Sequence, residues 1–254
     1  MRRKSGRSVN DFRCGCKTAW DLLYCNGISA GKSAERRQAL EPSALKPYRT
    51  VGAASETEYV INRSRFLGRC FPVTDEAEAL HILERIRKQH WDATHNCFAY
   101  RLKSGAARYS DDGEPQGTAG LPMMEVLKKR DLFDVLVICT RYFGGILLGA
   151  GGLVRAYTRS ASDAVEAAGL VSMEPCTQFS VAVPYAFRNA VWSVFERFGA
   201  IERADYGESI RCAFRCRTSE ADAFLKALTE RTEGRITAAA QGEGYFGFPV
   251  TETD

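Results

Sequence analysis

The chain has 254 residues, of which 45% are hydrophobic and 26% charged, a composition typical of a globular protein. Its length suffices for one large domain or two ordinary ones, and no apolar run approaches the ~20 residues of a membrane-spanning helix. The net charge of +4 misleads, because residues 1–46 hold ten Lys/Arg against four Asp/Glu while the remainder is slightly acidic. Any nucleic-acid function of that remainder must therefore depend on a local basic patch.

The nine cysteines are odd in number, and most lie singly in apolar segments, as is usual in a reducing compartment. Neither Cys14-Gly-Cys16 nor the pair Cys212 and Cys216 has the spacing of a zinc site, and the latter two would share one face of a strand. We therefore predict a cytoplasmic protein without a bound metal or cofactor.

The basic segment of residues 1–46 differs from the rest of the chain. It lacks the apolar core of a signal peptide, and we interpret it as a disordered extension or the product of an upstream start codon. Residues 27–33 resemble a phosphate-binding P-loop, but three residues separate the glycines where that motif has four. The sequence therefore does not predict an NTPase.

Regular patterns begin near Glu56. The first half is expected to hold an amphipathic helix N-capped by Thr74, an almost wholly apolar strand covered on both faces, and a last helix that Gly169 ends. In chain order we predict strands at 58–61 and 66–73, a helix at 75–90, a strand at 96–102, a polar glycine-rich loop at 103–120, a helix at 122–129, the apolar strand at 133–140, a second glycine-rich loop and a helix at 151–168.

The second half follows a short connection near Pro175. It is expected to contain a strand at 179–183, a helix at 185–198, strands at 201–206 and 210–217, a helix at 219–232 with a capping box of Ser219 and Asp222, and a strand at 235–241. This β-α-β-β-α-β order is that of a ferredoxin-like unit. We predict an α+β protein with two domains, residues 47–172 and 176–250, whose boundary falls near residues 171–177.

The glycine-rich segment of residues 140–157 is the most informative. It places five glycines within nine residues between a buried strand and a helix, where free backbone N–H groups and the helix dipole favour an anion. Arginines flank the loop, and Tyr142 and Phe143 offer rings for stacking. The alternative is a tight connection in which glycine allows close packing. The candidate anion- or nucleic-acid-binding residues are Arg141, Tyr142, Gly144, Gly145, Gly149, Gly151, Gly152 and Arg155.

A second candidate group combines an acidic turn with a histidine. Asp111, Asp112 and Glu114 have the oxygen atoms that Mg²⁺ prefers, and with His95 they could also supply acid and base groups. The alternative is an Asp-Asp-Gly turn followed by an extended step before proline, which we favour over a metal site. Cys97 is a candidate nucleophile on the strand of His95, but no catalytic residue can be assigned from these patterns.

These segments resemble the YigZ/IMPACT family. The matching motifs are His95-Asn96-Cys97 with Ala99-Tyr100, Ser110-Asp111-Asp112-Gly113-Glu114-Pro115 with Gly117-Thr118-Ala119-Gly120, Thr140-Arg141-Tyr142-Phe143-Gly144-Gly145 with the helix start through Tyr157, and Arg63-Ser64-Arg65-Phe66. The resemblance covers residues 48–250. It implies a first domain with the fold of the second domain of a small-subunit ribosomal protein, and a ferredoxin-like domain similar to the late domains of elongation factor G.

The resemblance also implies a function. Eukaryotic family members are associated with control of translation initiation through a stress-kinase activator, and bacterial members resemble nucleic-acid- or ribosome-binding proteins. The chain lacks the additional N-terminal domain of the eukaryotic regulators, which favours a bacterial setting. We expect a non-enzymatic RNA- or ribosome-binding protein that modulates translation, with no membrane partner. The alternatives are an enzyme acting on a small phosphorylated or peptide-like substrate, and a protein-interaction module.

Overall fold

The computed structural model describes residues 45–250, in which five α-helices accompany two antiparallel sheets. The mixed α+β class predicted from the sequence is confirmed. Within residues 45–250, no helix combines the length and the apolar character needed to cross a bilayer.

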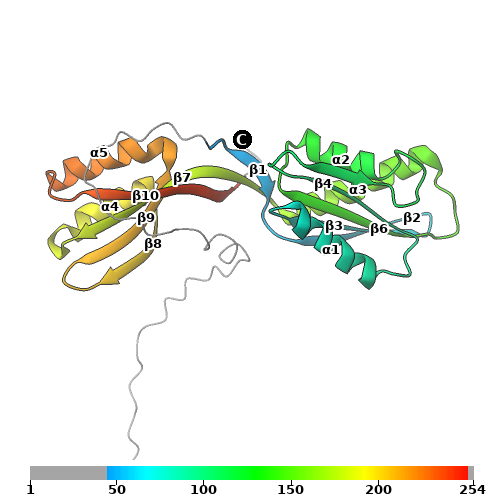
Figure 1. Ribbon diagram of the computed structural model, residues 1–254, viewed down its shortest axis with the longest axis horizontal. Coiled ribbons are helices and arrows are strands. Elements are labelled where there is room, and N and C mark those ends of the chain that lie inside the picture. Colours follow the sequence, from blue (N-terminus) through cyan, green and yellow to red (C-terminus); the bar gives the residue numbers. More distant parts are fainter. Residues whose placement is uncertain (1–44, 251–254) are drawn as a thin grey trace, which may run out of the picture. The chain divides into compact units, whose positions relative to one another are not determined.

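The first sheet has the strand order β2-β3-β6-β4-β5. Figure 1 labels its first four strands. Its central strand β6 is buried at every position through Arg141, because helices cover both faces of the sheet, as its apolar sequence predicted. Helix α1 packs on Phe98 and Ile138, whereas α2 and α3 pack on the opposite face around Val137 and Cys139. The elements are β2 (Ser55–Ile61), β3 (Ser64–Pro72), α1 (Glu76–Gln89), β4 (His95–Arg101), β5 (Ala107–Ser110), α2 (Gly120–Lys129), β6 (Val135–Tyr142) and α3 (Gly149–Ala168).

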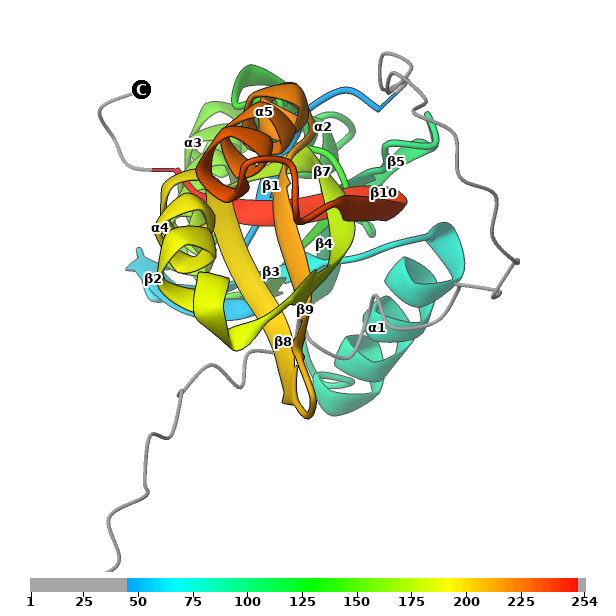
Figure 2. The same ribbon diagram turned by 90° about the vertical axis from the view of Figure 1, so that its left-hand side faces the viewer.

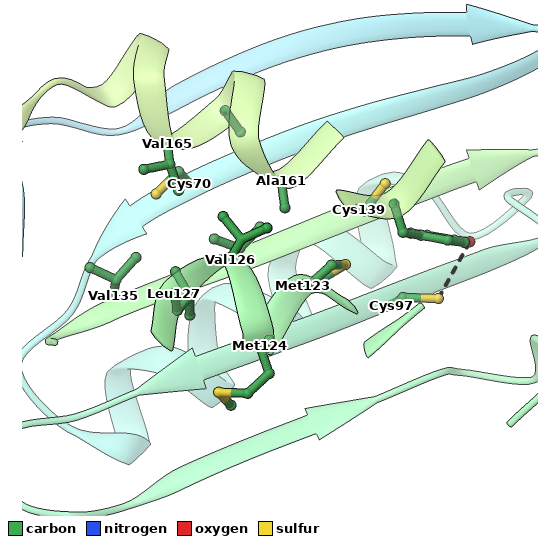
Figure 3. Close-up of a cluster of buried hydrophobic side chains, with 14 of the residues drawn as sticks. Cys70, Cys97, Met123, Met124, Val126, Leu127, Val135, Cys139, Ala161 and Val165 are labelled. Carbon is green, nitrogen blue, oxygen red and sulfur yellow. Dashed lines mark hydrogen bonds between the residues drawn. The ribbon is translucent and has the colours of Figure 1, made fainter. Parts of the chain in front are cut away.

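The core under α2 and α3 contains buried thiols (Figure 3). Cys97 of β4 and Cys139 of β6 lie opposite each other, and each thiol contacts a hydroxyl group of α3. Burial raises the pKa of Cys139 to about 12, so this thiol stays protonated near neutral pH. The six cysteines of the described part of the chain are all free and buried, as small apolar side chains would be.

The second sheet has the order β1-β7-β9-β8, with β10 on the other edge of β7. Helices α4 and α5 cover one face of this sheet (Figure 2), over a core centred on Phe195, Phe214 and Phe224. From β7 to β10 the element order is the β-α-β-β-α-β predicted from the sequence. The elements are β1 (Tyr48–Val51), β7 (Leu170–Val183), α4 (Arg188–Phe198), β8 (Gly199–Tyr206), β9 (Ile210–Arg217), α5 (Ala221–Thr232) and β10 (Ala238–Pro249).

Several predicted connections are wrong. Strand β7 runs without a break through Pro175, where we expected a connection. Proline is tolerated because it lies between Met173, the last residue paired with β1, and Cys176, the first paired with β9, so that edge of β7 needs no N–H there. Strands β1 and β5 were not predicted, and β10 begins and ends later than expected. Strands β1 and β10 depend on β7, which lies far away in the sequence, whereas β5 pairs with the preceding strand β4 across a short turn.

Two predicted helix caps are also wrong. The N-cap of α1 is Asp75, whose carboxylate accepts a hydrogen bond from the Glu78 N–H at 2.8 Å, while Thr74 donates to the Glu78 carboxylate. Before α5, a 3₁₀ turn at Thr218–Glu220 moves the helix start to Ala221, so the expected capping box does not form. The helix expected at 185–198 likewise begins with a 3₁₀ turn at Tyr185–Phe187.

Candidate functional site

Three polar side chains from two of the motifs meet in the core of the first sheet. The carboxylate of Glu114 accepts hydrogen bonds from Arg141 Nη1 at 2.6 Å and from the Tyr157 hydroxyl at 2.7 Å. The Glu114 and Arg141 side chains are only 3% and 6% exposed, so the two charges neutralise each other away from water. Burial raises the pKa of Tyr157 well above its usual value, which keeps the phenol protonated as a donor to Glu114. We call these three residues the buried cluster.

His95 lies at the edge of the buried cluster. Its Nδ1 is 2.8 Å from the Asp112 carbonyl oxygen, which can only accept, so Nδ1 must carry a proton. Nε2 consequently faces Glu114 Oε1, at 3.8 Å. The structure therefore brings together His95 and Glu114, which the sequence could place only on separate segments.

The two aspartates of the acidic turn have other partners. The Asp111 carboxylate accepts N–H groups of Gly117, Ala119 and Gly120 at 2.8–3.0 Å and so holds the turn that begins α2. The Asp112 carboxylate accepts the Asn96 N–H and pairs with Arg87. Both contacts fit the turn interpretation. Among residues 45–250, no group of three or more His, Cys, Asp or Glu side chains is arranged to hold a metal ion.

Arg141 has a partner inside the protein. Its guanidinium pairs with Glu114 and lies 5.4 Å from the ring centres of both Phe66 and Phe143. A phosphate contact by this side chain would require the buried ion pair to break. Our expectation that Arg141 reaches out to phosphate therefore disagrees with its environment, because a strand residue at the end of β6 points into the core.

The glycine-rich loop is held against the turn between β2 and β3. The Gly144 N–H donates to the Ser64 hydroxyl at 3.1 Å, and a Cβ built on Gly144 would lie 2.0 Å from the Arg63 carbonyl carbon. Only glycine allows this approach, so the close-packing interpretation holds for Gly144. The contact joins the Arg63-Ser64-Arg65-Phe66 motif to the loop and places Arg63 beside it.

Most of the other glycines, in the loop and at the start of α3, are open to solvent. Gly149 adopts a φ of +69° with free space around it, and Gly145 and Gly151 are also exposed. Gly152 is buried, with Leu148 Cβ 3.1 Å from where its own Cβ would lie. The α3 N-cap, Leu148, makes no side-chain cap, and the first turn holds no acidic residue. No carboxylate in this turn therefore competes with an external anion for the first N–H groups of α3.

Exposed side chains lie on the loop and on the segments hydrogen-bonded to it. Leu147 is 85% exposed and Trp91 83%, and neither Arg63 nor Arg155 has an ion-pair partner within 4 Å among residues 45–250. The Arg155 guanidinium lies 3.8 Å from where a Cβ of Gly151 would be, so it reaches back to the start of α3. We define the loop surface as Arg63, Trp91, Phe143, Ile146, Leu147 and Arg155, together with the first turn of α3.

Tyr142 belongs to a hydrogen-bond chain that the sequence did not reveal. Arg69, which is buried, donates to His90 Nε2 at 2.7 Å, and His90 Nδ1 lies 2.8 Å from the Tyr142 hydroxyl, which donates to Asp92 at 3.2 Å. Since a guanidinium can only donate, Nε2 must accept and His90 is neutral. Burial and the charge of Arg69 lower the pKa of His90. This series of hydrogen bonds fixes the segment that carries Trp91.

Sequence reasoning missed three important residues, Ser64, His90 and Tyr157. Ser64 and Tyr157 lie inside the quoted motifs, so their presence there was the available signal. His90 lies outside every motif, at the C-cap of α1, and only its contacts reveal its role.

Comparison with known proteins places this site in a family. The model of the Impact N-terminal domain matches residues 62–165. The chain is 40% identical over 194 residues to the IMPACT family member YvyE of Bacillus subtilis, covering 75% of this chain and 89% of that protein. It is 30% identical over 186 residues to the IMPACT family member YigZ of Escherichia coli, covering 71% and 91% of the two chains.

Two further similarities extend the comparison. The Protein IMPACT homolog of Dictyostelium discoideum is 40% identical over 93 residues, which are 34% of this chain and 26% of that protein. A crystal structure described as that of a hypothetical protein superposes with a TM-score of 0.50 at 26% identity, covering 77% of this chain and 98% of the other. The extent and identity of these matches show that the chain belongs to the YigZ/IMPACT family.

Proposed function

We propose that this protein is a non-enzymatic, cytoplasmic RNA- or ribosome-binding protein that modulates translation, and that the loop surface is its RNA contact. Membership of a family whose eukaryotic members are associated with control of translation initiation supports the proposal. The observation that carries it is the open start of α3, with its free N–H groups and the unpaired Arg155 beside exposed glycines.

This proposal changes the residues expected to meet phosphate. Arg141 supports the loop through its ion pair with Glu114. Arg155 keeps the phosphate role that the sequence predicted for it, and Arg63 takes the role predicted for Arg141. Phosphate neutralisation needs cations that face solvent, which these two arginines provide.

We further propose that the two sheets belong to two domains, residues 47–172 and 176–250. The first would have the fold of the second domain of a small-subunit ribosomal protein and the second a ferredoxin-like fold. The strand order β10-β7-β9-β8 and the two helices on one face support the latter.

The experiment is a titration of the full chain with cellular RNA and with ribosomes at several salt concentrations. The expected result is a several-fold loss of RNA affinity in Arg63→Gln and Arg155→Gln, with a salt dependence whose slope is lower by about 0.7 for each lost phosphate contact. Arg85→Gln is the matched control, because Arg85 is exposed on α1 without an ion pair among the described residues. Residues 1–46 add the same basic charge to every variant.

Equal affinity in all three variants would reject the loop surface as the RNA contact. If the wild-type chain also bound neither RNA nor ribosomes at low salt, the proposed function itself would be wrong.

A second candidate is an enzyme acting on a small phosphorylated or peptide-like substrate. It is favoured by one observation: His95 Nε2 faces the Glu114 carboxylate, and the His95 side chain is 18% exposed. An imidazole oriented by a carbonyl at one nitrogen and a carboxylate near the other is suited to proton transfer.

Reporter phosphomonoesters and peptides would test this candidate. Turnover that is lost in His95→Asn while RNA binding is retained would support an enzyme. Turnover that survives in the variant would assign the activity to a contaminant and remove this candidate.

A further inference from the structure

The loop surface carries two exposed aromatic side chains. Phosphate binding alone does not explain why these rings are exposed. Trp91 is 83% exposed and Phe143 is 45% exposed, although rings of this size usually bury most of their area. Trp91 follows α1 and Phe143 follows β6, and the fold brings these two segments side by side from distant parts of the chain.

Hydrogen bonds hold the two segments together. The Phe143 N–H donates to the Thr94 hydroxyl at 3.1 Å, and the Thr94 N–H donates to the Arg141 carbonyl at 2.9 Å. The Tyr142 hydroxyl donates to Asp92 at 3.2 Å, directly beside Trp91. The backbone that carries both rings is therefore fixed before any ligand arrives, which lowers the entropy lost on binding.

The charges around the rings favour a polyanion. Arg63 and Arg155 are exposed and unpaired within residues 45–250, and the nearby Glu58 is paired with Arg65. Rings beside unpaired cations suit a strand whose bases stack while its phosphates meet arginine.

We propose, building on the RNA-binding function proposed above, that the ligand of the loop surface is single-stranded RNA whose unpaired bases stack on Trp91 and Phe143. The phosphates of that strand meet Arg63, Arg155 and the N–H groups that begin α3. In a duplex the bases are paired and stacked on each other, so a duplex could engage only the cationic part of this surface.

The test compares a short fluorescein-labelled RNA strand of mixed sequence with the same strand annealed to its complement, by fluorescence anisotropy with the full chain. The strand is expected to bind more tightly than the duplex. Trp91→Ala and Phe143→Ala should each weaken strand binding by at least about fivefold, and Trp91→Phe should restore most of it. Both alanine variants should leave duplex binding nearly unchanged.

Tyr206→Ala is the control, because Tyr206 is a 64% exposed aromatic residue at the end of β8 in the second sheet. Urea unfolding of each variant verifies that the fold is intact, above all for Phe143→Ala, because the Phe143 ring lies against Arg141.

The outcomes separate this inference from the function on which it depends. Equal affinity for strand and duplex, with no effect of either alanine substitution, overturns base stacking but leaves RNA binding in place, and it would assign the rings to a protein partner. Absence of binding to both RNAs overturns the proposed function as well.

Discussion

The Glu114 carboxylate lies 2.6 Å from Arg141 Nη1, and both side chains are almost completely buried. One comes from the acidic turn before α2 and the other from the end of β6. This buried ion pair supports the loop surface from inside the protein. Loss of one partner would leave an uncompensated charge in the core. The pair therefore links the stability of the first sheet to the shape of the glycine-rich loop.

Glu114→Gln should lower the free energy of unfolding by about 3–5 kcal/mol, because Arg141 would remain buried without a countercharge. Urea unfolding followed by circular dichroism measures this change. Glu58→Gln is the matched control: Glu58 pairs with Arg65 at 2.8 Å on the surface, where water screens the charges, so its loss should change stability far less. Equal effects of the two substitutions would show that burial does not decide the importance of the pair.

Gly144→Ala should destabilise the protein by about 1–3 kcal/mol, since the new methyl group would overlap the backbone of Arg63. Thermal or urea unfolding gives the size of the loss. Gly207→Ala serves as the comparison, because a Cβ there would come no closer than 3.9 Å to a neighbouring atom. A fully stable Gly144→Ala variant would mean that the loop and the β2–β3 turn can separate at little cost.

Stability should fall as pH decreases below the ordinary histidine pKa of about 6.5. The pKa of His90 is lowered in the folded protein by burial and by Arg69, against the opposing effects of Glu56 and Asp92. The folded state therefore binds fewer protons than the unfolded chain, so acid favours unfolding until the pH reaches the folded-state pKa.

Urea midpoints at pH 7.5 and 5.5 check this dependence in three proteins. The wild type and His81→Gln, whose replaced side chain is exposed, should lose stability on acidification. His90→Gln should lose less, because its side chain no longer titrates. A drop in His90→Gln as large as that in the wild type would assign the pH dependence to other groups.

Cys97 and Cys139 should resist alkylation in the native protein. Both are fully buried, and burial raises the pKa of each thiol, to about 12 for Cys139. Because the thiolate is the reactive form, labelling should require unfolding. Mass spectrometry of peptides after iodoacetamide treatment, with and without urea, gives the extent of reaction. Rapid modification of either residue without urea would reveal frequent opening of the core beneath α3.

Several elements of the fold, and the family, could be predicted from periodicity and local motifs in the sequence. The apolar run at the centre of the first sheet predicted β6 and its burial on both faces, and alternation with helical spacing predicted the β-α-β-β-α-β order of the second half. The motifs around His95, Glu114 and Arg141 indicated the family. These features depend on neighbours in the sequence, and the physics that sets them is local.

Only the tertiary structure decided which side chains meet. Strand β1 exists because β7, more than 100 residues further along the chain, pairs with it. Arg141, expected to reach phosphate, instead turns inward to Glu114, while Ser64 attaches the loop to a turn that the sequence places far away. Hydrogen bonds and ion pairs of this kind are decided by three-dimensional proximity, because a buried charge must find its partner wherever the fold provides one.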